Sequence, residues 1–359
     1  MEIAIIGGGP AGSFLAYSLA KEGKEVTVFE EHKEIGNPIQ CSGVITQEIE
    51  KLISIPKSII INKITKVRFY SPNGNFFETK IKPDYVFNRS KLDKYIASLA
   101  KKEGVKFEFN KKFINFEKEG KLLKLNFKNS SENTKILIGA DGPFSTVAKA
   151  AGIFGKRDFI YGMQARAKIK NQEKNRGDIF LGYGEFGWSI PESKTVSRIG
   201  VVKEENPKED FDKLVKKLKA TIINYQSGMI PLYNHKLKTQ KNNIYLIGDA
   251  ATMVKASTHG GLLFSMLAAE DLKDSIINNK NYQKNWKRRL SKELWLNKKI
   301  RDTLKNFKDK DFNELVKLFS QNKLKKILEE NVRDYPSKFL FKILIKEPRL
   351  LKFSKKVLY

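Results

Sequence analysis

The first twelve residues read MEIAIIGGGPAG, an apolar run at residues 1–6 followed by a glycine-rich turn at residues 7–12. Small and apolar residues from Ser13 to Ala20 predict a helix after the turn. Glu25 to Phe29 then predict a second strand, which ends in the acid Glu30. This order of strand, glycine turn, helix, strand and acid is typical of the unit that holds the ADP half of a dinucleotide. The sequence therefore predicts an α/β chain with a Rossmann-like nucleotide-binding domain.

Each residue of the turn has its own physical role in this prediction. Gly7 permits the tight turn, Gly9 lets the backbone approach a pyrophosphate, and Gly12 lets the helix pack closely on the strand. The helix begins at Pro10 and Ala11, where amide groups and the positive end of the helix dipole face the phosphates. A glycine motif alone also occurs in ordinary turns, but here the strand, the helix and the spacing all favour a nucleotide site.

Glu30 indicates which nucleotide fits. It lies eighteen residues after Gly12, where a carboxylate can accept hydrogen bonds from both ribose hydroxyls. A carboxylate disfavours a 2′-phosphate at the same place, so FAD or NAD is preferred over NADP.

A later strand ends in a similar glycine turn. The strand at residues 243–247 runs into Gly248-Asp249-Ala250-Ala251, and Gly260-Gly261 precede another helix. Asp249 could hold a ribityl or ribose hydroxyl, Gly248 removes bulk beside a cofactor, and Gly260 and Gly261 could place bare amides near a flavin N1–C2=O. A plain structural turn is the alternative for this motif. Because the two glycine motifs are far apart in sequence, one long cofactor that touches both favours FAD over NAD.

Two further residues have two interpretations each. Asp141, in the turn Gly139-Ala140-Asp141-Gly142 after the strand at 136–138, could contact the cofactor or cap the next helix. Arg89 could bind the pyrophosphate, since Arg matches phosphate geometry well, or pair with a surface carboxylate.

The order of the motifs predicts a discontinuous chain organisation. Residues 1–60, 86–155 and 240–280 should form the nucleotide-binding domain, and the β-rich residues 61–85 and 156–239 an inserted substrate (cap) domain. Residues 281–359 should form a basic, helical C-terminal region.

The charge of the chain restricts its partners. The 359 residues carry a formal charge of +28, which suggests an acidic partner such as a phosphorylated substrate, an anionic membrane or nucleic acid. A uniformly lysine-rich surface is the alternative. From Lys280 onward there are 24 Lys and Arg against 9 Asp and Glu, and Lys338, Lys342 and Lys346 would form a stripe on an apolar helix suited to an anionic membrane. The same segment could instead pack on the core, and no motif that reads nucleic acid accompanies it.

Some classes of protein are disfavoured by composition. One cysteine excludes an internal disulfide framework, and three histidines far apart in sequence (His32, His235 and His259) give little support for a metal site. No signal peptide precedes the first strand, and no apolar run reaches about twenty residues. We therefore expect a cytoplasmic protein without a metal, and its peripheral attachment to the inner face of the membrane is consistent with the charge.

Taken together, these motifs resemble the para-hydroxybenzoate-hydroxylase-like FAD flavoproteins, and within them the geranylgeranyl reductase family. The resemblance covers about residues 1–280. It implies an FAD-dependent oxidoreductase that saturates isoprenoid double bonds in archaeal membrane lipids or chlorophyll side chains. Its substrate would be a prenylated lipid or a prenyl diphosphate.

Two stretches are similar to that family in particular. Pro38-Ile39-Gln40-Cys41-Ser42-Gly43 resembles its cysteine loop beside the flavin, which implies a role for Cys41 as proton donor or gate to the substrate. Residues 183–191 resemble its substrate motif P-x-x-Y-x-W-x-F-P, with Trp188 and Pro191 preserved. Tyr183 stands in place of the first Pro and Phe186 in place of the Tyr, so an aromatic channel survives without that hydroxyl. Ordinary sheet core is the alternative role for these aromatic residues.

Two other functions remain open from the sequence. A flavin monooxygenase or epoxidase of the same fold would consume oxygen rapidly when reduced. A peripheral membrane protein that keeps FAD only as a structural ligand would turn over no lipid. The electron donor could be ferredoxin, reduced deazaflavin or NAD(P)H, none of which leaves a recognisable trace in the sequence.

Overall fold

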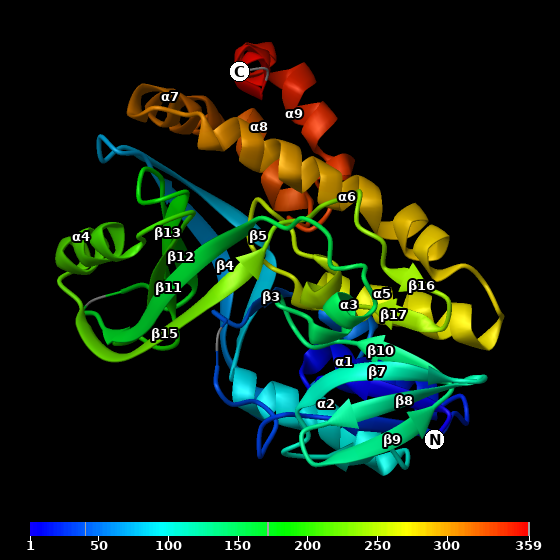
Figure 1. Ribbon diagram of the computed structural model, residues 1–359. Helices are drawn as coiled ribbons and strands as arrows, with labels where there is room; N and C mark the ends of the chain where they lie inside the picture. The colour runs from blue at the N-terminus through cyan, green and yellow to red at the C-terminus, as the bar shows by residue number, and fades with distance from the viewer. Residues whose placement is uncertain (40, 171, 358–359) are drawn as a thin grey trace.

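The computed structural model describes residues 1–39, 41–170 and 172–357, with the side chains of 354–357 left aside. It contains two large β-sheets, a small third sheet and a group of C-terminal helices (Figure 1). The predicted fold class, a Rossmann-like FAD-binding domain with an inserted β-rich region and a helical C-terminus, is confirmed.

The first large sheet carries the glycine turns. Its strand order is β16-β17-β10-β1-β2-β6, and β1 is paired in parallel with both β10 and β2. Helices α1, α2 and α5 belong to this layer, and α1 packs against the other two. The bounds of these elements are β1 (Ile3–Ile6), α1 (Pro10–Ala20), β2 (Val26–Phe29), α2 (Arg89–Lys102), β6 (Lys106–Glu108), β10 (Ile136–Gly139), β16 (Gln240–Lys241), β17 (Ile244–Leu246) and α5 (Leu262–Ile277).

A smaller antiparallel sheet lies beside this layer. It consists of β7 (Phe113–Glu119), β8 (Leu122–Phe127) and β9 (Ser130–Thr134). The short helix α3 (Thr146–Ala150) packs against β7 and β10. The inward residues of β8, such as Leu123 and Leu125, join the same hydrophobic core as β1 and α1.

The second large sheet has eight strands in the order β15-β11-β14-β13-β12-β4-β5-β3. Helix α4 (Lys208–Leu218) covers one face, where Phe211 and Leu214 pack against Phe180 and Ile199. The opposite face lines a large cavity. The strands are β3 (Val44–Thr46), β4 (Ile60–Tyr70), β5 (Phe76–Phe87), β11 (Phe159–Lys168), β12 (Arg176–Phe180), β13 (Phe186–Pro191), β14 (Val196–Lys203) and β15 (Thr221–Pro231).

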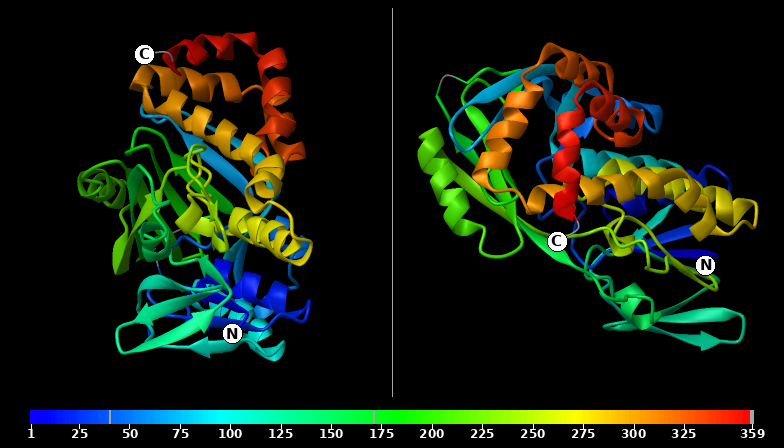
Figure 2. Two further views of the ribbon diagram at one scale, coloured as in Figure 1. Left: turned by 45° about the vertical axis from the view of Figure 1, so that its right-hand side comes forward. Right: turned by 90° about the horizontal axis from the view of Figure 1, so that it is seen from above.

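The C-terminal helices gather at the end of the molecule away from the N-terminal strands (left view of Figure 2). Helices α7 and α8 pack on β5, and α6 packs on α5, so this region connects the two large sheets. Of the helices that the structure describes, none combines the length and apolar character needed to span a bilayer. The elements are α6 (Tyr282–Lys305), α7 (Asp309–Phe319), α8 (Asn322–Glu330), η4 (Pro336–Lys338), α9 (Leu340–Lys346) and η5 (Pro348–Val357).

The strands of the two large sheets alternate along the chain, and we keep the predicted domain division as an interpretation of that order. Strand β3 does not follow this division, because it lies within residues 1–60 but pairs with β5 of the second sheet. The cysteine loop precedes β3, so it lies where the two sheets meet.

Candidate functional site

The glycine turn has the backbone geometry that its sequence predicts. Gly7 has a φ of +102°, and a Cβ atom there would collide with the carbonyl oxygen of Ala140. A Cβ atom on Gly12 would collide with the carbonyl oxygen of Gly7, so α1 can approach β1 only with glycine at that position. A Cβ atom on Gly9 would meet no protein atom within 4 Å. Gly9 therefore faces open space that a ligand could occupy, at the point where Pro10 and Ala11 begin α1.

Glu30 is buried and points at the turn. Its Oε2 accepts a hydrogen bond from the Gly8 amide at 2.7 Å, and its Oε1 accepts one from the His32 amide at 3.0 Å. The His32 ring lies beside it, with Nδ1 2.6 Å from the same Oε1. The carboxylate is thus held against the glycine turn, where the sequence predicts ribose binding, with His32 as a neighbour that the sequence did not indicate.

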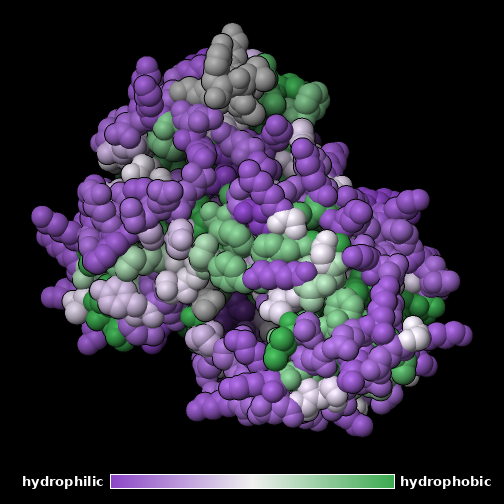
Figure 3. Space-filling model, in the orientation of Figure 1, coloured by the Kyte–Doolittle hydropathy of each residue, from purple (hydrophilic) through white to green (hydrophobic). Residues whose placement is uncertain are grey.

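One cavity of about 1100 Å³ extends from this turn to the inner face of the eight-stranded sheet. It lies slightly above the roughly 300–1,000 Å³ that is usual for ligand sites. Figure 3 shows a hollow near the centre of one face, beside a strip of hydrophobic surface, while hydrophilic side chains cover most of the rest.

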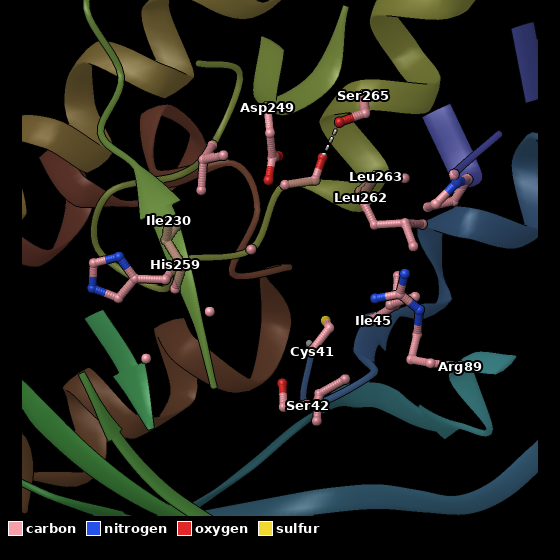
Figure 4. Close-up of a pocket in the computed structure, with 18 of the residues that line it drawn as sticks. Cys41, Ser42, Ile45, Arg89, Ile230, Asp249, His259, Leu262, Leu263 and Ser265 are labelled. Carbon is pink, nitrogen blue, oxygen red and sulfur yellow. Dashed lines mark hydrogen bonds between the residues drawn. The ribbon is translucent and has the colours of Figure 1, made fainter. Parts of the chain in front are cut away.

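Three predicted residues converge in the middle of the cavity. Figure 4 shows Asp249, Cys41 and Arg89 reaching into the same space from three separate segments of the chain. The Cys41 sulfur accepts a hydrogen bond from the Gly43 amide at 3.3 Å. Gln40, next to it in the predicted cysteine loop, lies outside the described residues.

Arg89 is held by a carboxylate of its own helix. Its Nε and Nη2 lie 3.2 and 3.1 Å from the two oxygens of Asp93. Burial would lower the pKa of Arg89, but Asp93 and Cys41 together raise it above its ordinary value. The carboxylate partner that we considered for Arg89 therefore exists, although it is mostly buried. Since Arg89 also lines the cavity, it can still face a ligand.

Among the described residues, Asp249 has no hydrogen-bonding cation. Burial raises its pKa from 3.8 to about 6, and the nearby charge of Arg89 opposes that rise. Gly261 lies so close that a Cβ atom there would be 3.1 Å from the Asp249 carboxylate. Gly260 and Gly261 line the cavity next to it and precede α5.

Asp141 and Gly248 have structural roles in this fold. Asp141 accepts hydrogen bonds from the Ser145 hydroxyl at 2.6 Å and the Val147 amide at 3.0 Å. It therefore caps the first turn of α3, which is one of the two roles predicted for it. It also borders the cavity. Gly248 has a φ of +63° and packs against Ala11 and Ser265. Gly248 is not among the described residues that line the cavity.

The predicted substrate residues divide between the two faces of the second sheet. Phe186 and Trp188 lie on the cavity face, with ring centroids 6.0 Å apart. Tyr183 instead packs on the α4 side, its ring 6.1 Å from that of Phe180. Pro191 is buried, and its carbonyl accepts a hydrogen bond from Asn62. Neither Tyr183 nor Pro191 is among the described cavity residues, because Tyr183 precedes β13 in a turn and Pro191 ends that strand.

A group of buried charges on the cavity wall was not predicted from the sequence. Lys255 pairs with Asp334, which also accepts a hydrogen bond from the Thr46 hydroxyl. Beside them, the Arg333 Nε donates to Asp84 at 2.9 Å. These partners come from four distant segments of the chain, so no local pattern could have revealed them.

His259 is a further residue of the cavity wall. Its ring stacks on Phe186 with centroids 5.7 Å apart and an interplanar angle of 16°. Its Nε2 lies 3.3 Å from a carboxylate oxygen of Glu185, a charge contact without hydrogen-bond geometry. The side chain of His259 is buried and lines the cavity.

These features fit FAD. Gly9 borders open space, and the Glu30 and Asp249 carboxylates lie along the same cavity. These are the places where phosphates and sugar hydroxyls need partners. The fold and the site together define a flavoprotein with a Rossmann-type FAD-binding layer and a β-rich layer over it.

Comparisons with known proteins agree. Residues 1–176 match the FAD binding domain family. A digeranylgeranylglycerophospholipid reductase of Methanococcus vannielii is 28% identical over 99% of this chain and 98% of its own length. A geranylgeranyl bacteriochlorophyll reductase-like protein of Thermoplasma acidophilum has the same fold, with a TM-score of 0.85, 23% identity and coverage of 99% and 98% of the two chains. A flavin-dependent brominase, Bmp2, is more distant, with a TM-score of 0.70 and 18% identity over 97% of this chain and 99% of its own.

The resemblance to the geranylgeranyl reductase family is thereby confirmed, and FAD is the cofactor of this chain.

Proposed function

We propose that this protein is an FAD-dependent reductase that saturates isolated double bonds of geranylgeranyl chains in membrane-lipid precursors. The observation that supports it most directly is the continuity of the cavity, from the glycine turn to an apolar sheet face. The named relatives support the same substrate class.

The second half of the cavity suits a prenyl chain. Its wall is built from apolar side chains of neighbouring strands that alternate inward, with the C-terminal helices closing one side. These residues are Ile64, Val67, Phe69, Ile81, Ile179, Leu181, Phe186, Trp188, Ile190, Val202, Ile230, Leu304 and Leu328. Such a wall excludes water from the reacting carbons, which the reduction of an isolated alkene requires.

Reduced FAD, when bound, supplies a hydride for the alkene. Gly9, Glu30 and Asp249 would hold the cofactor through its phosphates and sugar hydroxyls. Cys41 lies where the cofactor half of the cavity meets the apolar half, which suits the predicted role as proton donor or gate.

We further propose that the protein works at the inner face of the membrane. Helix α9 exposes two large apolar side chains, with Phe341 72% and Ile345 59% exposed, next to the exposed Lys342 and Lys346. Figure 3 shows hydrophobic surface in this part of the molecule. Exposed apolar residues flanked by lysines favour an anionic lipid surface.

Anaerobic single turnover tests the reductase function. The purified flavoprotein is reduced chemically, mixed with digeranylgeranyl lipid, and followed by flavin absorbance and lipid mass. Reoxidation with a gain of two hydrogens per double bond is the expected result. A flavin that stays reduced until air is admitted would favour the monooxygenase, and a flavin inert to both would favour a structural role.

The same assay compares electron donors. Reduced ferredoxin, reduced deazaflavin and NAD(P)H are each supplied in turn, and the productive donor is the one that sustains repeated turnover.

A further inference from the structure

The charged group on the cavity wall is built around Lys255. Its side chain is 5% exposed, and its ammonium pairs with the 1% exposed carboxylate of Asp334. Asp334 comes from the segment after α8, so the C-terminal region reaches back into the site. Thr46 of β3 donates its hydroxyl hydrogen to Asp334 as well, which fixes the carboxylate between two donors.

Lys255 lies where the cofactor half of the cavity meets the apolar half. A Cβ atom built on Gly260 would be 3.6 Å from the Lys255 Nζ and 3.7 Å from the Thr258 Oγ1. Gly260 is one of the two glycines expected beside the flavin ring. On its other side the ammonium lies 5.5 Å from the centre of the Phe264 ring. The ammonium is therefore close to the place where hydride transfer would occur.

A charged pair at this position needs an explanation. Burying an ammonium and a carboxylate costs desolvation energy, and apolar residues of similar size often stabilise a protein at least as well. Burial lowers the pKa of Lys255, although Asp334 opposes that effect. An ammonium with a lowered pKa releases its proton more readily than an ordinary lysine does.

We propose that Lys255 is the proton donor for the alkene reduction and that Asp334 positions its ammonium. This inference rests on the proposed function. The π bond breaks as hydride from the reduced cofactor forms a C–H bond at one carbon, and the Lys255 Nζ gives a proton that forms a C–H bond at the other. The alkene gains two electrons, the cofactor loses two, and Lys255 is left as an amine that regains a proton from water between turnovers.

Cys41 is the competing donor. The Gly43 amide donates a hydrogen bond to its sulfur at 3.3 Å, and the Arg89 guanidinium lies close enough to interact with the sulfur electrostatically. Neither contact removes the S–H proton of Cys41. Lys255 presents three N–H groups, of which Asp334 can engage only some. We assign the proton to Lys255 because its ammonium lies beside Gly260 and has N–H groups that Asp334 does not engage.

The charged groups around Lys255 set its behaviour with pH. Asp334 and Arg333 face it from the segment after α8, and Asp84 faces it from β5. Because a general acid must be protonated, flavin reoxidation should slow as the pH rises through the pKa of Lys255.

Three variants test the proposal. Lys255→Met with Asp334→Asn removes both charges together and leaves no lone buried charge to unfold the protein. Lys255→Arg keeps a positive charge opposite Asp334 but does not release a proton near neutral pH. The matched control is Lys203→Met with Asp210→Asn, a lysine–carboxylate pair at 2.7 Å that is not among the described cavity residues.

The experiment is anaerobic reoxidation of the reduced holoprotein by digeranylgeranyl lipid, measured by stopped flow. We expect both Lys255 variants to retain FAD, judged by its bound spectrum, and to lose at least about a hundredfold in reoxidation rate. The Lys203/Asp210 control should react like the wild type. A second readout that does not depend on activity is an NMR titration of ¹³C-labelled lysine in the oxidised holoprotein. It should show Lys255 titrating below the ordinary value of about 10.4.

The outcomes separate the two proposals. If the wild type is not reoxidised by any prenyl lipid, the reductase function itself fails. If the wild type is reoxidised and Lys255→Arg keeps its rate, Lys255 acts only through its charge and the proton-donor role is wrong. If the double variant loses its FAD, Lys255 holds the cofactor and the proposal is again overturned.

Discussion

The buried carboxylate of Asp249 has no hydrogen-bonding cation in the part of the chain that the structure describes, and its burial should make FAD binding depend on pH. The pKa of about 6 means that a large part of it is protonated in mild acid when FAD is absent. Hydroxyl groups of FAD would donate to the ionised form. We therefore expect the dissociation constant of FAD to be about tenfold larger at pH 5 than at pH 7.5, measured by titrating FAD into the apoprotein. Asp249→Asn should bind FAD more weakly and lose most of this dependence, and an unchanged slope in the variant would contradict the assignment.

The same group should affect the stability of the apoprotein. Its native pKa lies above that of the unfolded chain, so the native state binds more protons between about pH 4 and 6. The stabilisation that protonated Asp249 gives is complete below the pKa that Asp249 has in the unfolded chain, and it is lost as the pH rises through about 6. Urea unfolding at several pH values should therefore show a fall in unfolding free energy over that window, which is absent in Asp249→Asn.

Cys41 should prove to be a gate. We expect Cys41→Ala to retain FAD and to keep its reoxidation rate at saturating lipid within about tenfold, while more lipid is needed for half-saturation. Cys41→Ser serves as the control, since it preserves size. A hundredfold loss of rate, with the lipid concentration for half-saturation unchanged, would show that Cys41 is the proton donor.

At the level of residues, the sequence predicted what is local. Gly7, Gly9, Gly12 and Glu30 lie within one strand–helix–strand unit, and their spacing alone places them together. Lys255 and Asp334 are 79 residues apart, and their pairing depends on the path of the C-terminal region. Such a pair gives no signal in the sequence.

The turn before α1 allows a direct comparison of two glycines. Gly9→Ala meets open space, so we expect unfolding free energy within about 0.5 kcal/mol of the wild type. FAD affinity should nevertheless fall at least tenfold, because a methyl group occupies the approach to the phosphates, a cost of about 1.4 kcal/mol or more. Thermal unfolding and FAD titration measure the two effects.

Gly12→Ala is the matched variant within α1. Its methyl group would collide with the backbone of Gly7, so the helix must shift away from β1. We expect a loss of about 1–3 kcal/mol of stability together with weaker FAD binding. Equal stability of the two variants would show that the helix does not need this close approach.

Elements defined by local pattern were predicted well, and those that depend on distant partners were not. The turn residues Ser71-Pro72-Asn73-Gly74, between two apolar runs, predict a hairpin, and β4 and β5 form it. The acids Glu48 and Glu50 predict a helix that begins near Thr46. Thr46 ends β3, and a short 3₁₀ helix follows at Gln47–Lys51 with both acids in its first turn. The pairing of β3 with β5 outweighed the local preference. The lysine stripe at 338–346 is likewise divided, since η4 ends at Lys338 and α9 begins at Leu340.

For the whole molecule, the main prediction concerns the membrane. Phe341→Ser with Ile345→Ser removes two exposed apolar side chains of α9, each worth about 1.5–3 kcal/mol if buried in lipid. We expect binding to phosphatidylglycerol vesicles to fall at least tenfold in a sedimentation assay. Soluble turnover with detergent-dispersed lipid should be unchanged.

The control uses apolar residues exposed elsewhere. Ile114 is 50% exposed and Tyr225 62% exposed, and neither belongs to the C-terminal region. Ile114→Ser with Tyr225→Ser should leave vesicle binding intact. If both double variants bind vesicles equally well, α9 is not the docking surface.

The order of strands in the first sheet has a consequence for synthesis. Strand β10 lies between β1 and β17, yet β17 is the last of the three to leave the ribosome. An unfinished chain that ends between residues 139 and 244 therefore exposes the hydrogen-bonding edge of β10. Such an edge can pair with a second unfinished chain. Nascent chains halted in that interval are consequently the ones that most need a chaperone.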